Sequence, residues 1–166
     1  MKKILVMILM LAPMSLFAQK FAHFDMSQIL PEMEEYKTVS AELEKIQQQY
    51  QNEMEAIQKE YQTKVEEYKK LDAEGNTAQA ILQSKLTDIQ KIEERLQDFY
   101  QASQQELQKK QQEMQEPIYA KVIAAIKKIG EVGNYVYVME ASSVIFINTS
   151  LSTDVTAQIK AELGIK

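Results

Sequence analysis

The residue types that carry chemistry are few in this chain and do not form a catalytic pattern. His23 is the single histidine and there is no cysteine, so a metal site built from these ligands has no second member. The four glycines are scattered, which excludes a glycine-rich phosphate loop, and no Gly-x-Ser-x-Gly elbow occurs. The sequence therefore predicts no metal centre, no bound cofactor and no enzymatic activity.

Carboxylates are the remaining candidates for acid–base chemistry. Residues 37–116 hold 16 acidic and 11 basic side chains, interleaved, with a net charge of −5. This pattern is typical of a solvated helix surface, where no pocket shifts a carboxyl pKa. An enzyme would need a pocket elsewhere, lined by residues such as His23, Asp25 and Glu140. For His23 itself, a packed or surface position is the ordinary expectation.

Two long amphipathic stretches dominate the middle of the chain. Nine apolar residues of the first follow steps of three and four, in an 11-residue repeat: Val39, Leu43, Ile46, Tyr50, Met54, Ile57, Tyr61, Val65 and Tyr68. This spacing places the side chains on one helix face, and an 11-residue period favours a nearly straight or slightly right-handed coil. The return stretch carries a similar but less regular stripe from Leu82 to Ile118. Together they predict an antiparallel coiled-coil hairpin.

The tip of this hairpin is predicted near residues 75–76. Gly75 can adopt the left-handed conformation that follows a helix end, and Asn76 or Thr77 can cap the next helix. Counting outward from the tip gives the register between the arms: Leu71 near Ala80, Ile57 near Arg95 and Leu96, and Leu43 near Leu107 and Gln108.

The two ends of the chain differ in composition from the hairpin. Residues 20–25 form a short strand candidate, and residues 135–139 and 144–147 are rich in strand formers joined by residues 141–143 as a hairpin of strands. The near-continuous apolar character of these strands suggests burial on both faces.

Helix boundaries are also predicted at this end. Pro117 should kink the second long helix, and Gly130 with Gly133-Asn134 should stop it. A short final helix is expected to begin at Asp154 or Thr156, to bury Val155, Ile159 and Leu163, and to end near Gly164.

The predicted fold class is α+β, mainly α: a long antiparallel α-helical coiled-coil hairpin, or tentacle, on a small β-rich body. The tentacle takes residues 39–116, and the body takes residues 19–38 and 117–166. A body of this size buries little surface, so we expect several chains to share one core. A monomer would leave sheet edges and apolar faces bare.

Residues 1–18 have the pattern of a cleavable signal peptide. Lys2-Lys3 precedes an apolar run from Ile4 to Leu11, too short for a membrane span, and the expected cleavage site is Ala18–Gln19. The exported chain would carry a net charge of −7, from 17 basic and 24 acidic side chains. That acidity argues against a nucleic-acid partner and gives no attraction to anionic lipids.

The chain resembles the Skp/OmpH family of periplasmic chaperones over its whole length after the signal peptide. The segments that carry the resemblance are Phe21–Asp25 leading to Ile29-Leu30, Glu35-Tyr36-Lys37, Pro117-Ile118, Ala124–Lys128, Asn134–Ala141 with Val144, and Asp154-Val155-Thr156. Coiled coils resemble one another easily, so the strand-rich segment and the Asp-Val-Thr helix start are the specific part. The resemblance implies a jellyfish-shaped homotrimer in which the bodies join the chains and three tentacles enclose a cavity.

The implied activity is ATP-independent holding of unfolded outer-membrane proteins in the periplasm. We hypothesise that clients contact apolar and aromatic side chains on the inner tentacle face, with these candidates: Tyr36, Tyr61, Tyr68, Phe99 and Tyr100. For each of them, packing in the seam between the helices is the ordinary alternative. Well-known family members are basic, whereas this chain is acidic, which puts lipopolysaccharide binding in doubt. The alternative function is that of a structural or adaptor coiled coil of the cell envelope, bridging two folded partners.

Overall fold

The computed structural model describes residues 19–165, so the expected signal peptide lies outside the described residues. The chain divides into two compact units. The rod unit is Glu34–Tyr119, and the body unit combines the described residues before Glu34 with those after Tyr119. The second long helix contributes to both units, because its residues beyond Tyr119 belong to the body unit.

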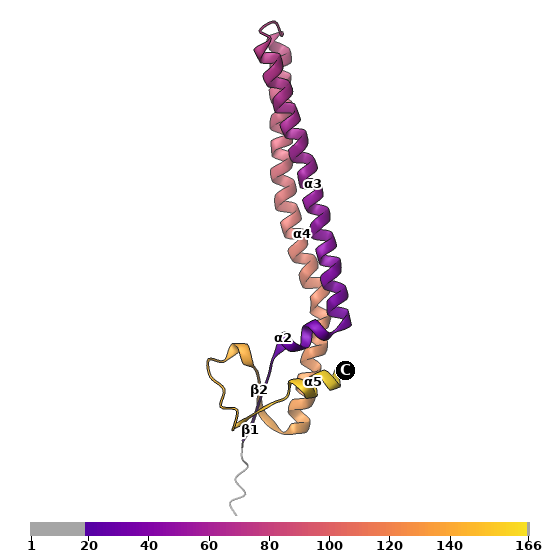
Figure 1. Cartoon of the computed structure of the whole chain (residues 1–166), viewed down its shortest axis with the longest axis vertical. Helices are drawn as coiled ribbons and strands as arrows, with labels where there is room; N and C mark the ends of the chain where they lie inside the picture. Colours follow the sequence, from indigo (N-terminus) through magenta and orange to yellow (C-terminus); the bar gives the residue numbers. More distant parts are fainter. Residues whose placement is uncertain (1–18, 166) are drawn as a thin grey trace, which may run out of the picture. The chain divides into compact units, whose positions relative to one another are not determined.

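The rod unit consists of two antiparallel helices. Helix α3 (Glu34–Ala73) and helix α4 (Gln79–Gly133) run side by side along it (Figure 1). All nine apolar residues of the predicted α3 stripe are buried or half-buried, with Ile57 the most completely covered. On α4, Ile92 is buried in the same way. The long coiled-coil hairpin predicted from the apolar spacing is thereby confirmed.

The turn at the tip is built around Gly75. Its φ of 67° is the left-handed conformation, and its N–H donates to the carbonyl of Asp72 at 3.2 Å. Thr77 differs from the prediction, because its hydroxyl donates to the carbonyl of Leu71 at 2.9 Å and so closes the end of α3. The first carbonyl to accept helix bonds in α4 is that of Ala78. The threonine side chain reaches backward because the last carbonyls of a helix lack partners within it.

Contacts between the arms agree with the predicted register. The Arg95 guanidinium pairs with the carboxylate of Glu60, one turn from Ile57. Lys85 pairs with Glu67 at 3.2 Å, nearer the tip. These pairs are partly exposed, so each contributes little to stability and serves mainly to mark which residues face one another.

The body unit contains a three-stranded sheet in the order β2-β1-β3. Strand β1 (Lys20–Phe24) lies in the middle and pairs in parallel with β2 (Tyr135–Glu140) and with β3 (Ser152–Asp154). Parallel pairing needs long connections, and the two long helices supply the one between β1 and β2. The chain's first strand is therefore held between two segments from its other end.

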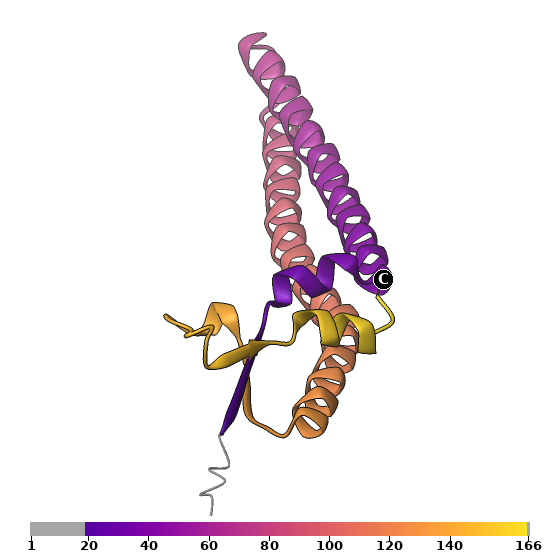
Figure 2. The ribbon, with the colours of Figure 1, turned by 60° about the horizontal axis from the view of Figure 1, so that its bottom comes forward.

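The core of the body unit lies on one face of this sheet. Helix α2 (Met26–Ile29) follows β1, continues into the 3-10 turn η1 (Leu30–Glu32), and lies against α5 (Thr156–Glu162) (Figure 2). The buried apolar side chains come from β1, α2, η1, α4, α5 and the residues that flank η1 and α5: Ala22, Phe24, Ile29, Leu30, Met33, Val122, Ala125, Val155 and Ile159. The predicted final helix is confirmed, with Val155 and Ile159 fully buried and Gly164 at φ 74° after its end. Leu163, which was also expected inside, is only half-buried.

The predicted hairpin of strands is wrong. After β2 the chain forms a 3-10 turn, η2 (Ala141–Ser143), and residues 144–147 are not in a strand. Ile145 is fully exposed and Phe146 is 77% exposed. A segment with strand-forming side chains still needs a free edge to pair with, and both edges of β1 are taken by β2 and β3.

The end of α4 also differs in one detail from the prediction. The helix continues through Pro117 and Gly130 and ends at Gly133. Asn134 follows with a φ of 52°, the left-handed conformation that stops a helix. A Cβ added at Gly130 would lie 3.4 Å from the Val138 side chain. The small size of Gly130 therefore allows close packing and does not end the helix.

Candidate functional site

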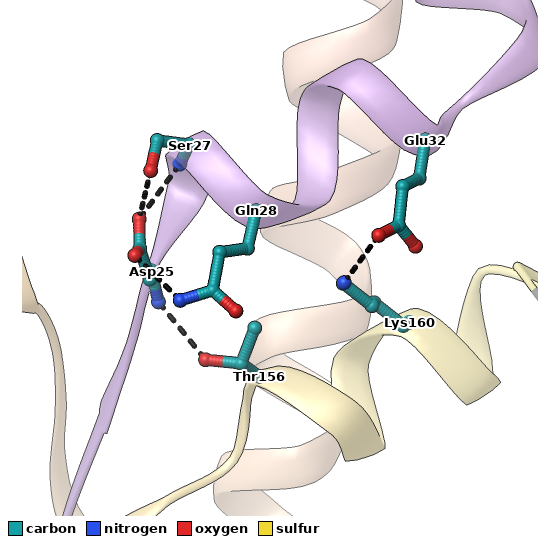
Figure 3. A network of polar contacts seen from close by, with 6 residues as sticks. All are labelled: Asp25, Ser27, Gln28, Glu32, Thr156 and Lys160. Atoms are coloured by element: carbon teal, nitrogen blue, oxygen red, sulfur yellow. Dashed lines mark hydrogen bonds and ion pairs between the residues drawn. The ribbon is translucent and has the colours of Figure 1, made fainter.

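A polar network joins the two ends of the chain within the body unit. Figure 3 shows Asp25 at its centre, where the carboxylate caps α2. Oδ1 accepts from the N–H and hydroxyl of Ser27 at 2.9 and 2.6 Å, and Oδ2 accepts from Gln28 Nε2 at 2.7 Å. The Asp25 N–H donates to Thr156 Oγ1 at 3.0 Å. Hydrogen bonds from Ser27 first, and then from Gln28, lower the pKa of the Asp25 carboxyl.

The other half of this network starts α5. The Thr156 N–H donates to Asp154 Oδ1 at 2.9 Å. Hydrogen bonding to Thr156, first through its side chain and then through its backbone N–H, lowers the pKa of the Asp154 carboxyl. The Val155 N–H donates to the carbonyl of His23 at 2.9 Å, and Lys160 pairs with Glu32 at 2.8 Å. These contacts fasten the start of α2 and the start of α5 to one another, which is a structural role.

The residues considered for an enzymatic pocket do not converge. His23 shares a hydrogen bond with Ser152 Oγ at 2.9 Å, Asp25 caps α2, and the Glu140 carboxylate accepts from Ser142 Oγ at 2.9 Å. Only His23 lines the cavity described below. Among the residues that the structure describes, no group of three His, Asp or Glu side chains could hold a metal ion.

An apolar cavity of about 210 Å³ lies on the outer face of the sheet, opposite the core. The alternation of β1 produces it, because Ala22 and Phe24 point into the core and Phe21 and His23 point away. Phe21 stacks on Tyr137 with ring centroids 6.3 Å apart. The other apolar lining comes from β2 and from the segment before β3: Met139, Val144, Phe146, Ile147 and Leu151. Phe146 and Leu151 are largely exposed and Met139 is about half exposed, so this face presents apolar surface to solvent.

The candidate client contacts occupy different environments on the rod unit. Tyr36, Tyr61 and Tyr68 are half-buried on α3, and the last two belong to its apolar stripe. Phe99 is half-buried on α4 and sets its ring edge against Tyr50, with centroids 6.2 Å apart. Tyr100, its neighbour, is 53% exposed. The structure thus separates Tyr100 from the packed aromatics, while client contact by any of the five remains a prediction.

Two further features of the rod unit were not expected from the sequence. Ile81, beside the tip, is half-exposed, although it directly precedes the stripe residue Leu82. The sequence signal for this exposure was that Ile81 lies one residue away from the apolar stripe. Phe99 also borders a shallow hollow on α4 with charged neighbours that include Arg95 and Asp98. The rod surface therefore offers isolated apolar groups among charges rather than one continuous patch.

Comparison with known proteins agrees with this architecture. The profile of the family described as outer membrane protein (OmpH-like) matches residues 20–163. A chaperone protein Skp from Yersinia enterocolitica is 28% identical over 152 residues, which cover 90% of this chain and 91% of that protein. No helix among the described residues is long and apolar enough to cross a membrane.

A solved structure from Caulobacter crescentus, named as an OmpH-like outer membrane chaperone, has the same fold. It aligns with a TM-score of 0.69 at 20% identity and covers 87% of this chain and 83% of its own. The family match spans nearly all of the described residues, including the strands of the body unit as well as the helices of the rod unit. This chain belongs to the OmpH-like outer membrane protein family.

Proposed function

We propose that this protein is an ATP-independent periplasmic holdase, which binds unfolded outer-membrane proteins and keeps them from aggregating before membrane insertion. The observation that carries the proposal is the rod unit of an OmpH-like family member: two long helices with a narrow buried seam and isolated exposed apolar groups. A non-native chain has no fixed surface to match, so it is best held by many weak, spaced contacts.

Tyr100 is the candidate contact that the geometry favours. The residue is 53% exposed, so about half of its surface is available to a client. Tyr36, Tyr61, Tyr68 and Phe99 are half-buried and would offer only part of their rings. Aromatic side chains suit this role because they contribute a large contact area with little loss of conformational entropy.

Self-association through the body unit is the second part of the proposal. The outer sheet face exposes Tyr137, Phe146 and Leu151, and the body buries few side chains of its own. Within the described residues, the segment 144–147 carries strand-forming side chains without a strand partner, and the outer edges of β2 and β3 are unpaired. A second copy supplies both an edge for that segment and an apolar cover for the face. We propose three copies, following the family resemblance.

The proposed location and the disfavoured partners rest on the sequence. Export by the signal pattern at residues 1–18 would place the protein in the periplasm, where no ATP is needed for holding. The acidic charge disfavours nucleic acid and lipopolysaccharide as ligands, because both are polyanions.

Light scattering tests the holdase proposal directly. A urea-unfolded outer-membrane barrel is diluted into buffer without ATP, in the presence of increasing amounts of this protein. We expect suppression of aggregation that saturates near three chains per client. No suppression by folded, assembled protein would overturn the proposal and favour the adaptor function, in which the rod binds one folded envelope protein.

A further inference from the structure

The residue that signal cleavage would leave at the start of the chain is a glutamine. The pattern of residues 1–18 places the cut after Ala18, so Gln19 would carry the α-amine of the exported protein. The structure places Gln19 directly before strand β1, in an exposed position outside the sheet. A residue in such a position can turn its side chain back toward its own backbone nitrogen.

A glutamine at the start of a chain has a reaction that needs no other reagent. An α-amine ordinarily has a pKa of about 7.7–8.0, so part of it is unprotonated and nucleophilic near neutral pH. Its nitrogen attacks the side-chain amide carbon, Cδ, and the new C–N bond closes a five-membered lactam. The bond from Cδ to Nε2 breaks, and Nε2 takes up the proton that the amine loses and leaves as ammonia. Because both groups belong to one residue, the reaction has the rate advantage of an intramolecular process.

The strand that follows begins very close to the expected chain end. Strand β1 is central in the sheet, with β2 on one side and β3 on the other. It starts at Lys20, the second residue of the expected exported chain. Phe21 is the first residue in register with both neighbouring strands, opposite Tyr137 and Ser152. An aminopeptidase that removed residues 19–21 would therefore take away the first pairs of the sheet.

These first residues also make contacts with distant parts of the body unit. Lys20 Nζ donates to the carbonyl of Gly133 at 3.5 Å, and Phe21 stacks on Tyr137 with ring centroids 6.3 Å apart. The next residue, Ala22, is buried in the core. Since β1 is the strand that joins β2 to β3, trimming it from its start would weaken the whole sheet. Aminopeptidases bind a chain through its α-amine, and a lactam has none.

We propose that Gln19 closes to a pyroglutamate lactam after export, and that this lactam protects β1 from trimming by aminopeptidases. The proposal rests on the export proposed above and is independent of client binding. Closure also removes the positive charge of the α-ammonium, so the exported chain, which is already acidic, becomes more so.

Mass spectrometry of the intact protein tests the closure. The full chain, including residues 1–18, is expressed in bacterial cells, recovered from the periplasm, and kept near neutral pH at physiological temperature for several days. We expect the mass of residues 19–166 less about 17 Da, which is the mass of ammonia. Gln19→Asn is the matched control, because it keeps the amide but would have to close a four-membered ring, which bond-angle strain opposes. This variant should keep its full mass.

Digestion of the folded proteins by a broad-specificity aminopeptidase tests the protection. We expect the mass of the wild-type protein to stay unchanged. The Gln19→Asn protein should shorten from its start, and its midpoint of urea unfolding should fall as residues of β1 are lost. Equal resistance of the two proteins would overturn the protective role, because the paired strand would then protect itself.

The mass of the wild-type protein also separates this proposal from those it rests on. The full mass of residues 19–166 overturns the closure and leaves export and client holding as proposed. A chain that begins at a different residue after residue 18 overturns it as well, because Gln19 then has no α-amine. A chain that retains residues 1–18 overturns the proposed export together with the closure, while light scattering still measures client holding by itself.

Discussion

Replacing Phe99 and Tyr100 one at a time separates packing from client contact. They are consecutive aromatics on α4, so replacing either one with Ala changes helix propensity in the same turn and to a similar extent. Phe99 is half-buried against Tyr50, whereas Tyr100 is 53% exposed. Phe99→Ala should therefore reduce stability, and Tyr100→Ala should reduce client binding.

The magnitudes follow from burial. Truncating a fully buried Phe to Ala removes about 3–5 kcal/mol, so half-burial predicts a loss of about 2 kcal/mol for Phe99→Ala. The edge-to-face contact with Tyr50 contributes about 0.5–1.5 kcal/mol to the unfolding free energy that Phe99→Ala would lose. Tyr100→Ala should stay within about 0.5 kcal/mol, as surface substitutions usually do. Urea unfolding followed by circular dichroism measures both values.

The assay of function is the aggregation of an unfolded outer-membrane barrel. We expect Tyr100→Ala to protect the client less well than wild type, at a protein concentration where its own helices are fully folded. If Tyr100→Ala unfolds as easily as Phe99→Ala, the reasoning from burial is refuted. If it is as stable as wild type and protects the client fully, Tyr100 is not a contact.

Three further predictions concern stability. Ile159→Ala empties a fully buried site in the body unit and should cost about 2–5 kcal/mol, seen as a lower urea midpoint than for a control such as Ala157→Gly on the exposed side of α5. Gly75→Ala places a Cβ at φ 67° in open space and should lower stability by about 1 kcal/mol, measured by thermal unfolding; no change would contradict the strain argument. The carboxyls of Asp25 and Asp154 have pKa values lowered from 3.8, so their contribution is complete above that pH and is lost as pH falls through the lower folded values. Acid unfolding of the body unit should therefore shift to higher pH in Asp154→Asn, and an unchanged acid midpoint would show that the network does not drive it.

The helical hairpin could be predicted because its signal is local. Steps of three and four residues from Val39 to Tyr68 indicate both a helix and the face that it buries. The structure buries or half-buries this stripe at each position. Gly75 marked the tip because few other residues adopt its conformation. The register between the arms followed from counting, since two straight antiparallel helices joined at a short turn have only one alignment.

The sheet could be predicted only in part because strand pairing is not local. Residues 144–147 have the composition of a strand, yet β3 formed instead at Ser152–Asp154, a short segment with little apolar character. What decided this was access to the edge of β1 and the hydrogen bonds around Thr156, which fasten the chain just after β3. Neither is visible in the composition of the segment itself.

The sequence by itself determined the two long helices, their tip, the final helix and the family likeness, because each depends on neighbours in the chain or on ordered motifs. Only the tertiary structure decided that β1 is the central strand, that Phe99 packs while Tyr100 is exposed, and that His23 lies in an apolar cavity. Those outcomes depend on contacts between residues that are far apart in the sequence. His23 and Ser152, for example, share a hydrogen bond although 129 positions separate them. The geometry of packing sets them, and no local period encodes it.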